Sequence, residues 1–404
     1  METKNLVDFL VIGGGAAGYF SALRYAFLQP THSVVILEKG KATLQKVKVS
    51  GGGRCNVTHG CFDPRELVQH YPRGNKELIG PFNTFACGDM MAWLDERGVE
   101  LKIEDDGRVF PTTNSSQTII DCFENEREKL NIKLHKAGAL SIQQIDEGFL
   151  VQTTASNYQT KKLLVATGSS KQMWQHLESI GVKIIPPVPS LFTFNIKHPL
   201  LKDLPGLSFP DATIELEKNQ LDSFGPALIT HWGLSGPCVL KLSAWGAREL
   251  HKRDYKFNIY LSCLGLPADQ VQESIQEYKK TNGKQKMENR CPFDLPKRFW
   301  KRICELSDAQ GNWADLSNST LQNMVDLLSR CEMNVEGKST FKDEFVTSGG
   351  IDKKEIDFRT MQHKQLEALY FAGEVIDIDA ITGGFNFQSA WTTAWIAAEN
   401  AASL

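Results

Sequence analysis

The chain has 404 residues, a formal net charge of −3 and 41% hydrophobic residues. This length suggests two or three domains, the apolar content is enough for a core, and the charge argues against a protein built mainly to hold nucleic acid. The nine cysteines include no Cys-x-x-Cys pair, so we expect reduced thiols in a cytoplasmic protein. The nine histidines form no cluster with metal-ligand spacing, so we expect no metal.

The first apolar stretch, FLVIGGGAAGYFSAL at 9–23, does not fit a signal peptide or a membrane span. Asp8 precedes it, three glycines interrupt it and Arg24 follows it. A span needs roughly 20 apolar residues, and no part of the chain supplies them without charges, so we expect no membrane partner. The pattern instead predicts a buried strand over 6–12, a tight turn, and a helix from Ala16.

The turn carries the spacing of a dinucleotide-binding fingerprint. Gly13 permits the tight turn, Gly15 lets the backbone approach a diphosphate, and Gly18 lets the helix pack on the strand. Glycine-rich turns are common, so the spacing alone is weak evidence. A second strand at 33–37 ends in Glu38, which lies 20 residues after Gly18, where an acid accepts hydrogen bonds from the adenosine ribose. Together these features predict a nucleotide-binding βαβ unit.

The patterns further along the chain predict an interrupted domain. Another apolar strand lies at 162–170, and period-two alternation from 191 onward predicts antiparallel strands of a small barrel or sandwich. Helical periodicity follows, and strand signals return near 346. We therefore expect a Rossmann-like α/β domain split by a barrel-like β insertion that itself carries a helical subdomain. The expected boundaries are 1–190 with 346–404, 191–265 with 334–345, and 266–333.

A basic segment lies within the helical part. Residues 277–302 carry nine Lys and Arg against three Asp and Glu. A solvated helical face is the interpretation that we favour, and a nucleic-acid patch is the alternative.

The C-terminal segment, which completes the Rossmann-like domain, favours FAD over NAD as the cofactor. No second G-x-G-x-x-G occurs in the chain. Flavoenzymes close this fold with a strand that ends in a Gly-acid pair, and Gly373 and Glu374 supply one. A glycine-rich turn into a helix follows at 383–390, and its N-terminus would face the flavin pyrimidine ring, where reduction builds negative charge. An ordinary helix start is the alternative.

The sequence resembles the BaiN-like bacterial flavoproteins, described as NAD(P)/FAD-dependent oxidoreductases, which include a bile-acid-operon flavoprotein and aminoacetone oxidases. Besides the N-terminal fingerprint, the matching motifs are SGGGRCNVTH at 50–59, ITHWGLSGP at 229–237, VTSGGI at 346–351 and FAGEVIDIDAITGGFNFQSAWTTA at 371–394. Departures lie at His59, Ala380, Phe385, Phe387, Ala394 and in ATGSS at 166–170. The changes at 385 and 387 lie beside the expected flavin edge and bear on substrate preference.

The resemblance places the 50–59 loop along the FAD, where Arg54 and Asn56 would contact the diphosphate or the flavin. Cys55 is expected to be a packed thiol, with a redox role as the less favoured alternative. The complete set of residues expected to bind the cofactor is Gly13, Gly15, Ala16, Ala17, Gly18, Glu38, Lys39, Lys46, Gly52, Gly53, Arg54, Cys55, Asn56, Ala139, Ala166, Thr167, Gly168, Gly373, Glu374, Asp379, Gly384, Phe385, Asn386 and Phe387.

His231 and Phe387 are the candidate catalytic residues. His231 has a pKa suited to proton donation, although holding the 233–237 turn is the role that we favour for it. Trp232 would cover a planar ligand or fill the core. Phe385 and Phe387 would line an apolar wall or pack in the core. We expect substrate to enter between the FAD domain and the insertion.

The predicted function is that of an FAD-dependent oxidoreductase with a small-molecule substrate. Flavin-mediated hydride transfer to an acceptor such as an enone, with NAD(P)H as a transient donor, is the expected reaction. One alternative is an amine oxidase of the aminoacetone type that uses oxygen. The other is an RNA-binding flavoprotein resembling the tRNA uridine-modifying enzymes, although we do not expect nucleic acid as a partner.

Overall fold

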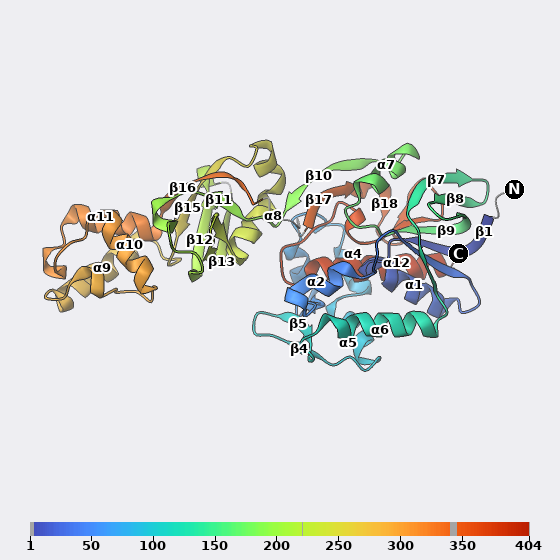
Figure 1. Ribbon diagram of the computed structural model, residues 1–404, viewed down its shortest axis with the longest axis horizontal. Coiled ribbons are helices and arrows are strands. Elements are labelled where there is room, and N and C mark those ends of the chain that lie inside the picture. The colour runs from blue at the N-terminus through green and yellow to red at the C-terminus, as the bar shows by residue number, and fades with distance from the viewer. Residues whose placement is uncertain (1–3, 220, 340–345, 404) are drawn as a thin grey trace. The chain divides into compact units, whose positions relative to one another are not determined.

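The computed structural model describes residues 4–219, 221–339 and 346–403 (Figure 1). It divides into a first unit, Met1–Pro187 with Val346–Leu404, and a second unit, Val188–Phe345. The first unit is a mixed α/β domain built on a largely parallel sheet, and the second contains a closed antiparallel barrel. The predicted fold class, a split Rossmann-like domain with a barrel-like insertion that carries helices, is confirmed.

Five parallel strands form the centre of the first unit. Their order in the sheet is β20 (Leu369–Phe371), β9 (Asn157–Val165), β1 (Lys4–Ile12), β2 (Val34–Glu38) and β6 (Lys133–Lys136). Helix α1 (Ala16–Leu28) begins at the predicted Ala16 and connects β1 to β2. The buried faces of β1 are apolar on both sides, as expected for a strand inside a parallel sheet.

Shorter strands extend this sheet or form small sheets beside it. The extensions are β7 (Ala139–Ile145), β8 (Gly148–Thr153), β18 (Ile356–Asp357) and β19 (Gln362–His363). The small sheets are β3 (Thr58–His59) with β5 (Arg108–Pro111) and β4 (Leu101–Ile103), and β10 (Ile184–Ser190) with β17 (Val346–Ile351). The remaining helices are α2 (Gln45–Gly53), α3 (Pro64–Leu67), α4 (Ile79–Thr84), α5 (Cys87–Asp95), α6 (Ser116–Lys129), α7 (Lys171–Ser179) and α12 (Phe385–Ser403).

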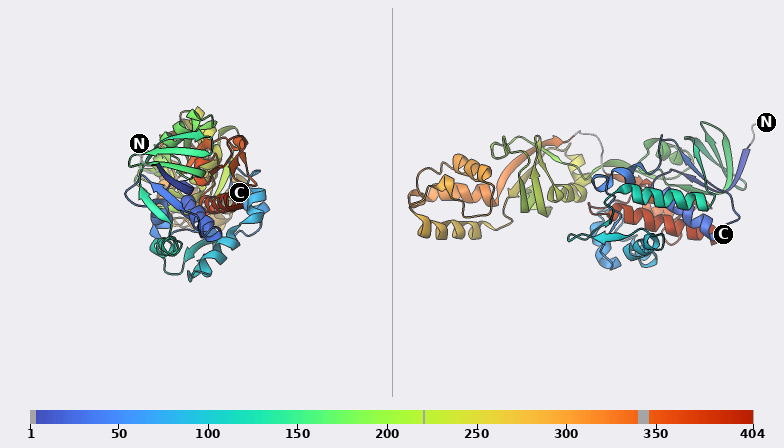
Figure 2. Two further views of the ribbon diagram at one scale, coloured as in Figure 1. Left: turned by 90° about the vertical axis from the view of Figure 1, so that its right-hand side faces the viewer. Right: turned by 60° about the horizontal axis from the view of Figure 1, so that its bottom comes forward.

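Helix α12 packs against α1, so the end of the chain completes the core begun by its start (Figures 1 and 2). Phe20 of α1 lies 5.6 Å from Trp391 of α12 and 5.0 Å from Trp93 of α5, measured between ring centroids. Small buried residues such as Ala394 and Ala398 let the two helix backbones approach. Among the described residues, no helix is long and apolar enough to cross a bilayer.

The barrel of the second unit follows the predicted alternation. Its strands, in order around the barrel, are β11 (Phe194–Ile196), β14 (Gly233–Ser235), β13 (Asp222–Ile229), β12 (Ser208–Leu216), β15 (Phe257–Ser262) and β16 (Cys331–Lys338). Ile214 and Leu216 of β12 are buried, while Glu215 between them is partly exposed. Helix α8 (Pro237–Lys252) packs against β13 and β12.

Helices follow the barrel strand β15, where the helical periodicity was predicted. They are α9 (Ala268–Asn282), α10 (Lys297–Leu306) and α11 (Asn318–Ser329), drawn in yellow to orange in Figure 1. Phe299 of α10 contacts the barrel residue Phe209 with ring centroids 4.7 Å apart, and Trp300 stacks on Trp313. These aromatic contacts fix the helices on the barrel through one continuous core.

Candidate functional site

Close packing requires glycine at two of the fingerprint positions, Gly13 and Gly18. A Cβ at Gly13, where φ is +115°, would lie 2.4 Å from the carbonyl oxygen of Ala166. A Cβ at Gly18 would lie 1.8 Å from the carbonyl oxygen of Gly13. A side chain at either position would therefore collide with backbone, and Ala166 marks where the end of β9 meets the turn.

Gly15 differs from these two glycines because space around it is open. A Cβ built there has no other residue within 4 Å. Gly15 is also the N-cap of α1, with no side chain capping the helix and no acid in its first turn. The N–H groups of Ala16 and Ala17 donate to no residue that the structure describes. An uncapped helix start beside open space fits a diphosphate group.

Glu38 turns back toward the same loop from the end of β2. Its two carboxylate oxygens accept hydrogen bonds from the backbone N–H of Gly14 at 2.7 Å and of Gly40 at 2.6 Å. Sequence reasoning did not anticipate these contacts, and each oxygen retains a second lone pair for a ligand hydroxyl. The ribose contacts remain a prediction.

Two further predicted residues lie near Glu38. Its backbone carbonyl accepts from Ala137 N at 3.0 Å, which brings the start of β7, and with it the buried Ala139, close to this strand end. Lys39 follows Glu38 and is exposed. Strand β7 therefore brings the predicted cofactor residue Ala139 near the carboxyl end of β2.

The glycine-rich end of α2, where the backbone leaves helical geometry, is uncovered. Gly52 and Gly53 have φ values of +68° and +86°, and a Cβ at either would meet no atom within 4 Å. The Arg54 guanidinium pairs with Glu104 at 2.6 Å and lies 3.9 Å from the Phe110 ring centroid. Glu104 was missed by sequence reasoning, because nothing in the local pattern links it to residue 54.

Cys55 is a packed thiol. Its side chain is fully buried, and burial raises the pKa of the thiol from 9.0 to about 12. The neutral thiol dominates at any physiological pH, and it is a poor nucleophile. The structure thus supports the favoured interpretation of Cys55 over a redox role.

Asn56 joins the glycine loop to the C-terminal turn. With its amide oriented to satisfy both sides, its oxygen accepts from Gly384 N at 2.9 Å and its nitrogen donates to Thr58 O at 3.0 Å. A Cβ at Gly384 would lie 2.3 Å from Thr58 O, so this contact also requires glycine. Two predicted cofactor residues from opposite ends of the chain are therefore in direct contact.

A second junction joins three segments next to α1. Lys46 of α2 forms an ion pair with Glu374 of the 3-10 helix η7 (Gly373–Val375). A Cβ at Gly168 would lie 3.8 Å from Glu374 Oε2, and one at Gly373 would lie 3.0 Å from the Cβ of Ala17.

One polar atom at this junction lacks a partner. Thr167 Oγ1 is buried and has no hydrogen-bond partner among the described residues. A bound polar group would satisfy it, so the residues present fit FAD.

Two predicted residues are engaged within the protein. Asp379 is fully buried and forms an ion pair with the buried Arg73, a residue that sequence reasoning missed. The Asn386 side chain bridges the Ala380 backbone, accepting from its N–H at 2.9 Å and donating to its carbonyl at 3.1 Å. Both therefore shape the turn before α12.

The two candidate aromatic residues have different surroundings. Phe385 is only 2% exposed, and its ring stacks on His70 at 4.1 Å and on His59 at 4.5 Å between centroids. These rings enclose the Phe385 side chain, which agrees with packing in the core rather than with an apolar pocket wall. Phe387 is partly exposed and stacks on Trp391 at 5.6 Å.

His231 and Trp232 lie on an exposed turn between β13 and β14 of the second unit. Trp232 is 36% exposed and donates to Thr193 Oγ1 at 3.1 Å, so it does not fill the core. The His231 side chain has no hydrogen bond to a described residue, and the turn is held instead by Thr230 N donating to Gly233 O at 2.8 Å. The favoured structural role for His231 is therefore not supported.

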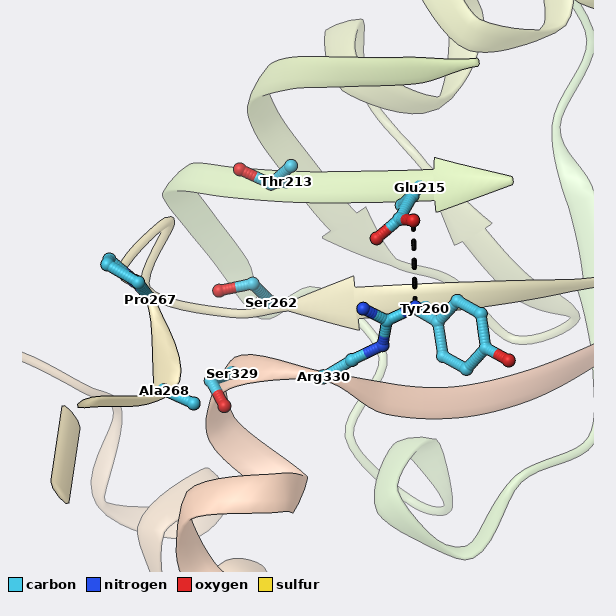
Figure 3. A pocket seen from close by; sticks show the side chains of 8 residues that line it. All are labelled: Thr213, Glu215, Tyr260, Ser262, Pro267, Ala268, Ser329 and Arg330. Carbon is cyan, nitrogen blue, oxygen red and sulfur yellow. Dashed lines mark ion pairs between the residues drawn. The ribbon is translucent and has the colours of Figure 1, made fainter. Parts of the chain in front are cut away.

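A small cavity of about 220 Å³ also lies within the second unit (Figure 3). Arg330 lies 3.6 Å from Glu215 and 4.2 Å from the Tyr260 ring centroid at its edge. None of the predicted site residues lines it. In the described ranges, no three His, Cys, Asp or Glu residues are grouped to hold a metal.

The parallel sheet, the uncapped glycine-rich start of α1, and the Gly-acid pair packed against it define an FAD-binding flavoprotein oxidoreductase. Residues 7–400 match the HI0933-like protein Rossmann domain family, and the chain belongs to this family.

Three proteins are similar to this chain in sequence or in fold. "Ribosomal RNA dihydrouridine synthase" of Haemophilus influenzae is 30% identical, covering 96% of this chain and 97% of its own. "3-dehydro-bile acid delta(4,6)-reductase" of Clostridium scindens is 23% identical, covering 97% and 98%. The structure of a 3-ketosteroid delta1-dehydrogenase from Sterolibacterium denitrificans shares the fold, with a TM-score of 0.50 and 12% identity over 99% of this chain and 100% of that one.

Proposed function

We propose that this flavoprotein reduces a carbon–carbon double bond conjugated to a carbonyl, and that its acceptor is a uracil base of ribosomal RNA. The observation that carries the proposal is the similarity to the Haemophilus influenzae ribosomal RNA dihydrouridine synthase across nearly the full length of both chains. The proposal keeps the enone reduction expected from the sequence. It replaces the expected small-molecule acceptor with a nucleic acid, which the net charge alone did not favour.

The names of two relatives describe one kind of chemistry. The C5=C6 bond of uracil is conjugated to the C4 carbonyl, and the name of the bile-acid reductase also describes the saturation of ring double bonds. When bound and reduced, FAD supplies a hydride. The acceptor takes the hydride at the β-carbon and a proton at the α-carbon, so the enzyme or solvent must deliver one proton.

The chain's own residues would hold the cofactor. The free N–H groups at the start of α1 would bind its diphosphate, Glu38 its ribose, and the unpartnered Thr167 hydroxyl one of its polar groups. NAD(P)H is proposed as a transient donor, because the sequence contains one dinucleotide fingerprint.

A second candidate acceptor is a small cyclic enone, which the bile-acid reductase relative favours. One experiment separates the candidates. The FAD-loaded protein is reduced without oxygen by NADPH, then mixed with unmodified ribosomal RNA transcript, with a steroid enone, or with oxygen. We expect the RNA to reoxidise the flavin and to yield a nucleoside two hydrogens heavier than uridine by mass spectrometry. Reoxidation of the flavin by the enone alone would assign the small-molecule function. In a separate sample without NADPH, reduction of the flavin by aminoacetone, followed by its reoxidation by oxygen, would assign the amine oxidase.

A further inference from the structure

We infer that the helical part of the second unit carries a surface that binds the phosphate backbone of RNA, an inference that rests on the proposed function. We define this basic surface by six exposed cations on α10 and on the segment before it. They are Lys284, Lys286, Arg290, Lys297, Arg298 and Lys301.

Helix α10 holds its cations outward. Its opposite face is buried at Phe299, Trp300 and Ile303, which are at most 1% exposed. Phe299 packs on the barrel, and Trp300 stacks on Trp313. The helix cannot rotate about its axis without exposing these rings, so the basic face is fixed toward solvent.

The other cations lie on a segment tied directly to α10. The Trp300 indole donates a hydrogen bond to the Met287 carbonyl at 2.8 Å, and Met287 begins the 3-10 helix η4 (Met287–Asn289). Lys286 and Arg290 flank this short helix. The cations on α10 and the two that flank η4 are therefore held on segments in direct contact, and Lys284 lies two residues before Lys286.

The position of the α10 cations opposes helix stability. Lys297 and Arg298 occupy the first turn, where the helix dipole is positive, and that turn holds no acid. Sequences that fold well place acids there, and departures from local rules concentrate at functional sites. A solvated face kept for solubility alone would not need this arrangement.

The basic surface is also free to bind. Two nearby cations are engaged, since Arg302 pairs with Glu305 at 3.0 Å and Lys279 donates to the Leu316 carbonyl at 2.7 Å. None of the six cations pairs with a residue in the described ranges. Two exposed acids, Glu288 and Asp294, lie within the segment, so positive charge remains in excess.

RNA is the partner that this chemistry fits. Exposed Lys and Arg side chains on a rigid scaffold displace counterions from a polyphosphate backbone, and they do so without reading sequence. The reacting uridine would be selected at the flavin, while this surface would hold the surrounding RNA. A cationic surface for a small enone would have no comparable purpose.

The test replaces Lys297, Arg298 and Lys301 together with Gln in the FAD-loaded, full-length protein. Binding to a structured ribosomal RNA transcript is measured by filter retention across a series of salt concentrations. We expect affinity to fall at least about tenfold, and the slope of log K against log salt to become shallower by about 2, since each phosphate contact contributes roughly 0.7 to 0.9. Flavin content and reduction by NADPH should be unchanged.

Two controls isolate the charge effect. The exchange Lys297→Arg, Arg298→Lys and Lys301→Arg keeps every charge and should retain affinity and slope. Replacing Lys241, Lys252 and Lys256, which are exposed on and after α8, with Gln removes equal charge elsewhere in the second unit. This second triple should change the slope little.

The outcomes are distinct. Unchanged RNA affinity and slope in the Gln triple, or no RNA binding by the unaltered protein, would overturn the basic surface. The proposed function is judged separately by the dihydrouridine product. If the unaltered protein modifies RNA and the Gln triple variant binds RNA equally well, the proposed function would stand and the basic surface would be ruled out.

Discussion

Lys46 and Glu374 form an ion pair although 328 residues separate them in the chain. The pair joins α2 to η7 at the junction where Gly168 and the unpartnered Thr167 hydroxyl also lie. Lys46 is 55% exposed, so the pair contributes little to folding.

We therefore expect Lys46→Met to lower the free energy of unfolding of the cofactor-free protein by less than about 1 kcal/mol. Its effect on FAD should be larger, with affinity falling about tenfold, because a cation would be lost beside the proposed diphosphate site. Urea unfolding and flavin fluorescence titration measure the two quantities. A large loss of stability with unaltered FAD affinity would make the pair purely structural.

The glycines Gly15 and Gly18 should respond oppositely to alanine. Gly15 has open space and φ of −88°, so Gly15→Ala should leave the cofactor-free fold stable and weaken FAD binding by filling the cradle. Gly18→Ala places a Cβ against the Gly13 carbonyl and should destabilise the fold itself, by about 1–3 kcal/mol. Thermal unfolding without FAD, followed by FAD titration, distinguishes them. If both variants lowered the melting temperature equally, the space around Gly15 would not be open.

Cys55 should make stability fall at alkaline pH. Its pKa is raised from 9.0 to about 12 by burial, so between these values the folded protein retains a proton that the unfolded chain releases. The stabilisation is complete below about pH 9 and is lost as pH rises toward 12. Urea unfolding from pH 8 to 11 should show a shallower decline for Cys55→Ala than for the unaltered protein. Parallel curves would place the thiol in contact with solvent.

The buried Arg73–Asp379 pair should be costly to break. Asp379→Asn removes the carboxylate charge that faces the buried Arg73 guanidinium, and losing one charge of a buried ion pair costs about 3–5 kcal/mol. Glu305→Gln removes the partner of Arg302 at the surface and serves as the matched control, with little effect expected. Urea unfolding at neutral pH measures both. Similar small effects would show that water reaches Arg73.

His231→Ala should leave thermal stability unchanged, because the side chain is exposed and bonds to no described residue. The same variant tests the weak catalytic candidate. Slower flavin reoxidation by RNA, with normal reduction by NADPH, would identify His231 as the proton donor. A clear drop in melting temperature would instead restore the structural role.

Local pattern predicted the parts of the fold that depend on neighbouring residues. The turn from β1 into α1 follows from the fingerprint spacing of Gly13, Gly15 and Gly18. The position of Glu38 at the end of β2 follows from the length of the second strand and its spacing from Gly18. The alternation of apolar and polar residues in β12 and β15 likewise predicted a barrel-like insertion, because a strand that is buried on one face has an apolar residue at every second position.

Contacts between distant segments could not be predicted in this way. Arg73 meets Asp379 across 306 residues, and Arg54 meets Glu104 through the pairing of short strands. Phe385 is enclosed by His59 and His70, which no periodicity connects to α12. Such partners are set by tertiary packing, which a single sequence does not encode as a local signal.

The pairing of β20 with β9 determines when the FAD-binding unit can form during synthesis. Leu369 aligns with Leu163, so the sheet lacks a parallel strand until the ribosome has made about 200 further residues. At 5–20 residues per second this wait is roughly 10–40 s. The intervening second unit has its own core and can fold meanwhile. Strand β8 covers β9 at residues 157–160, but the edge at 163–165 stays open throughout, so the nascent first unit is the stage at which chaperones would be needed.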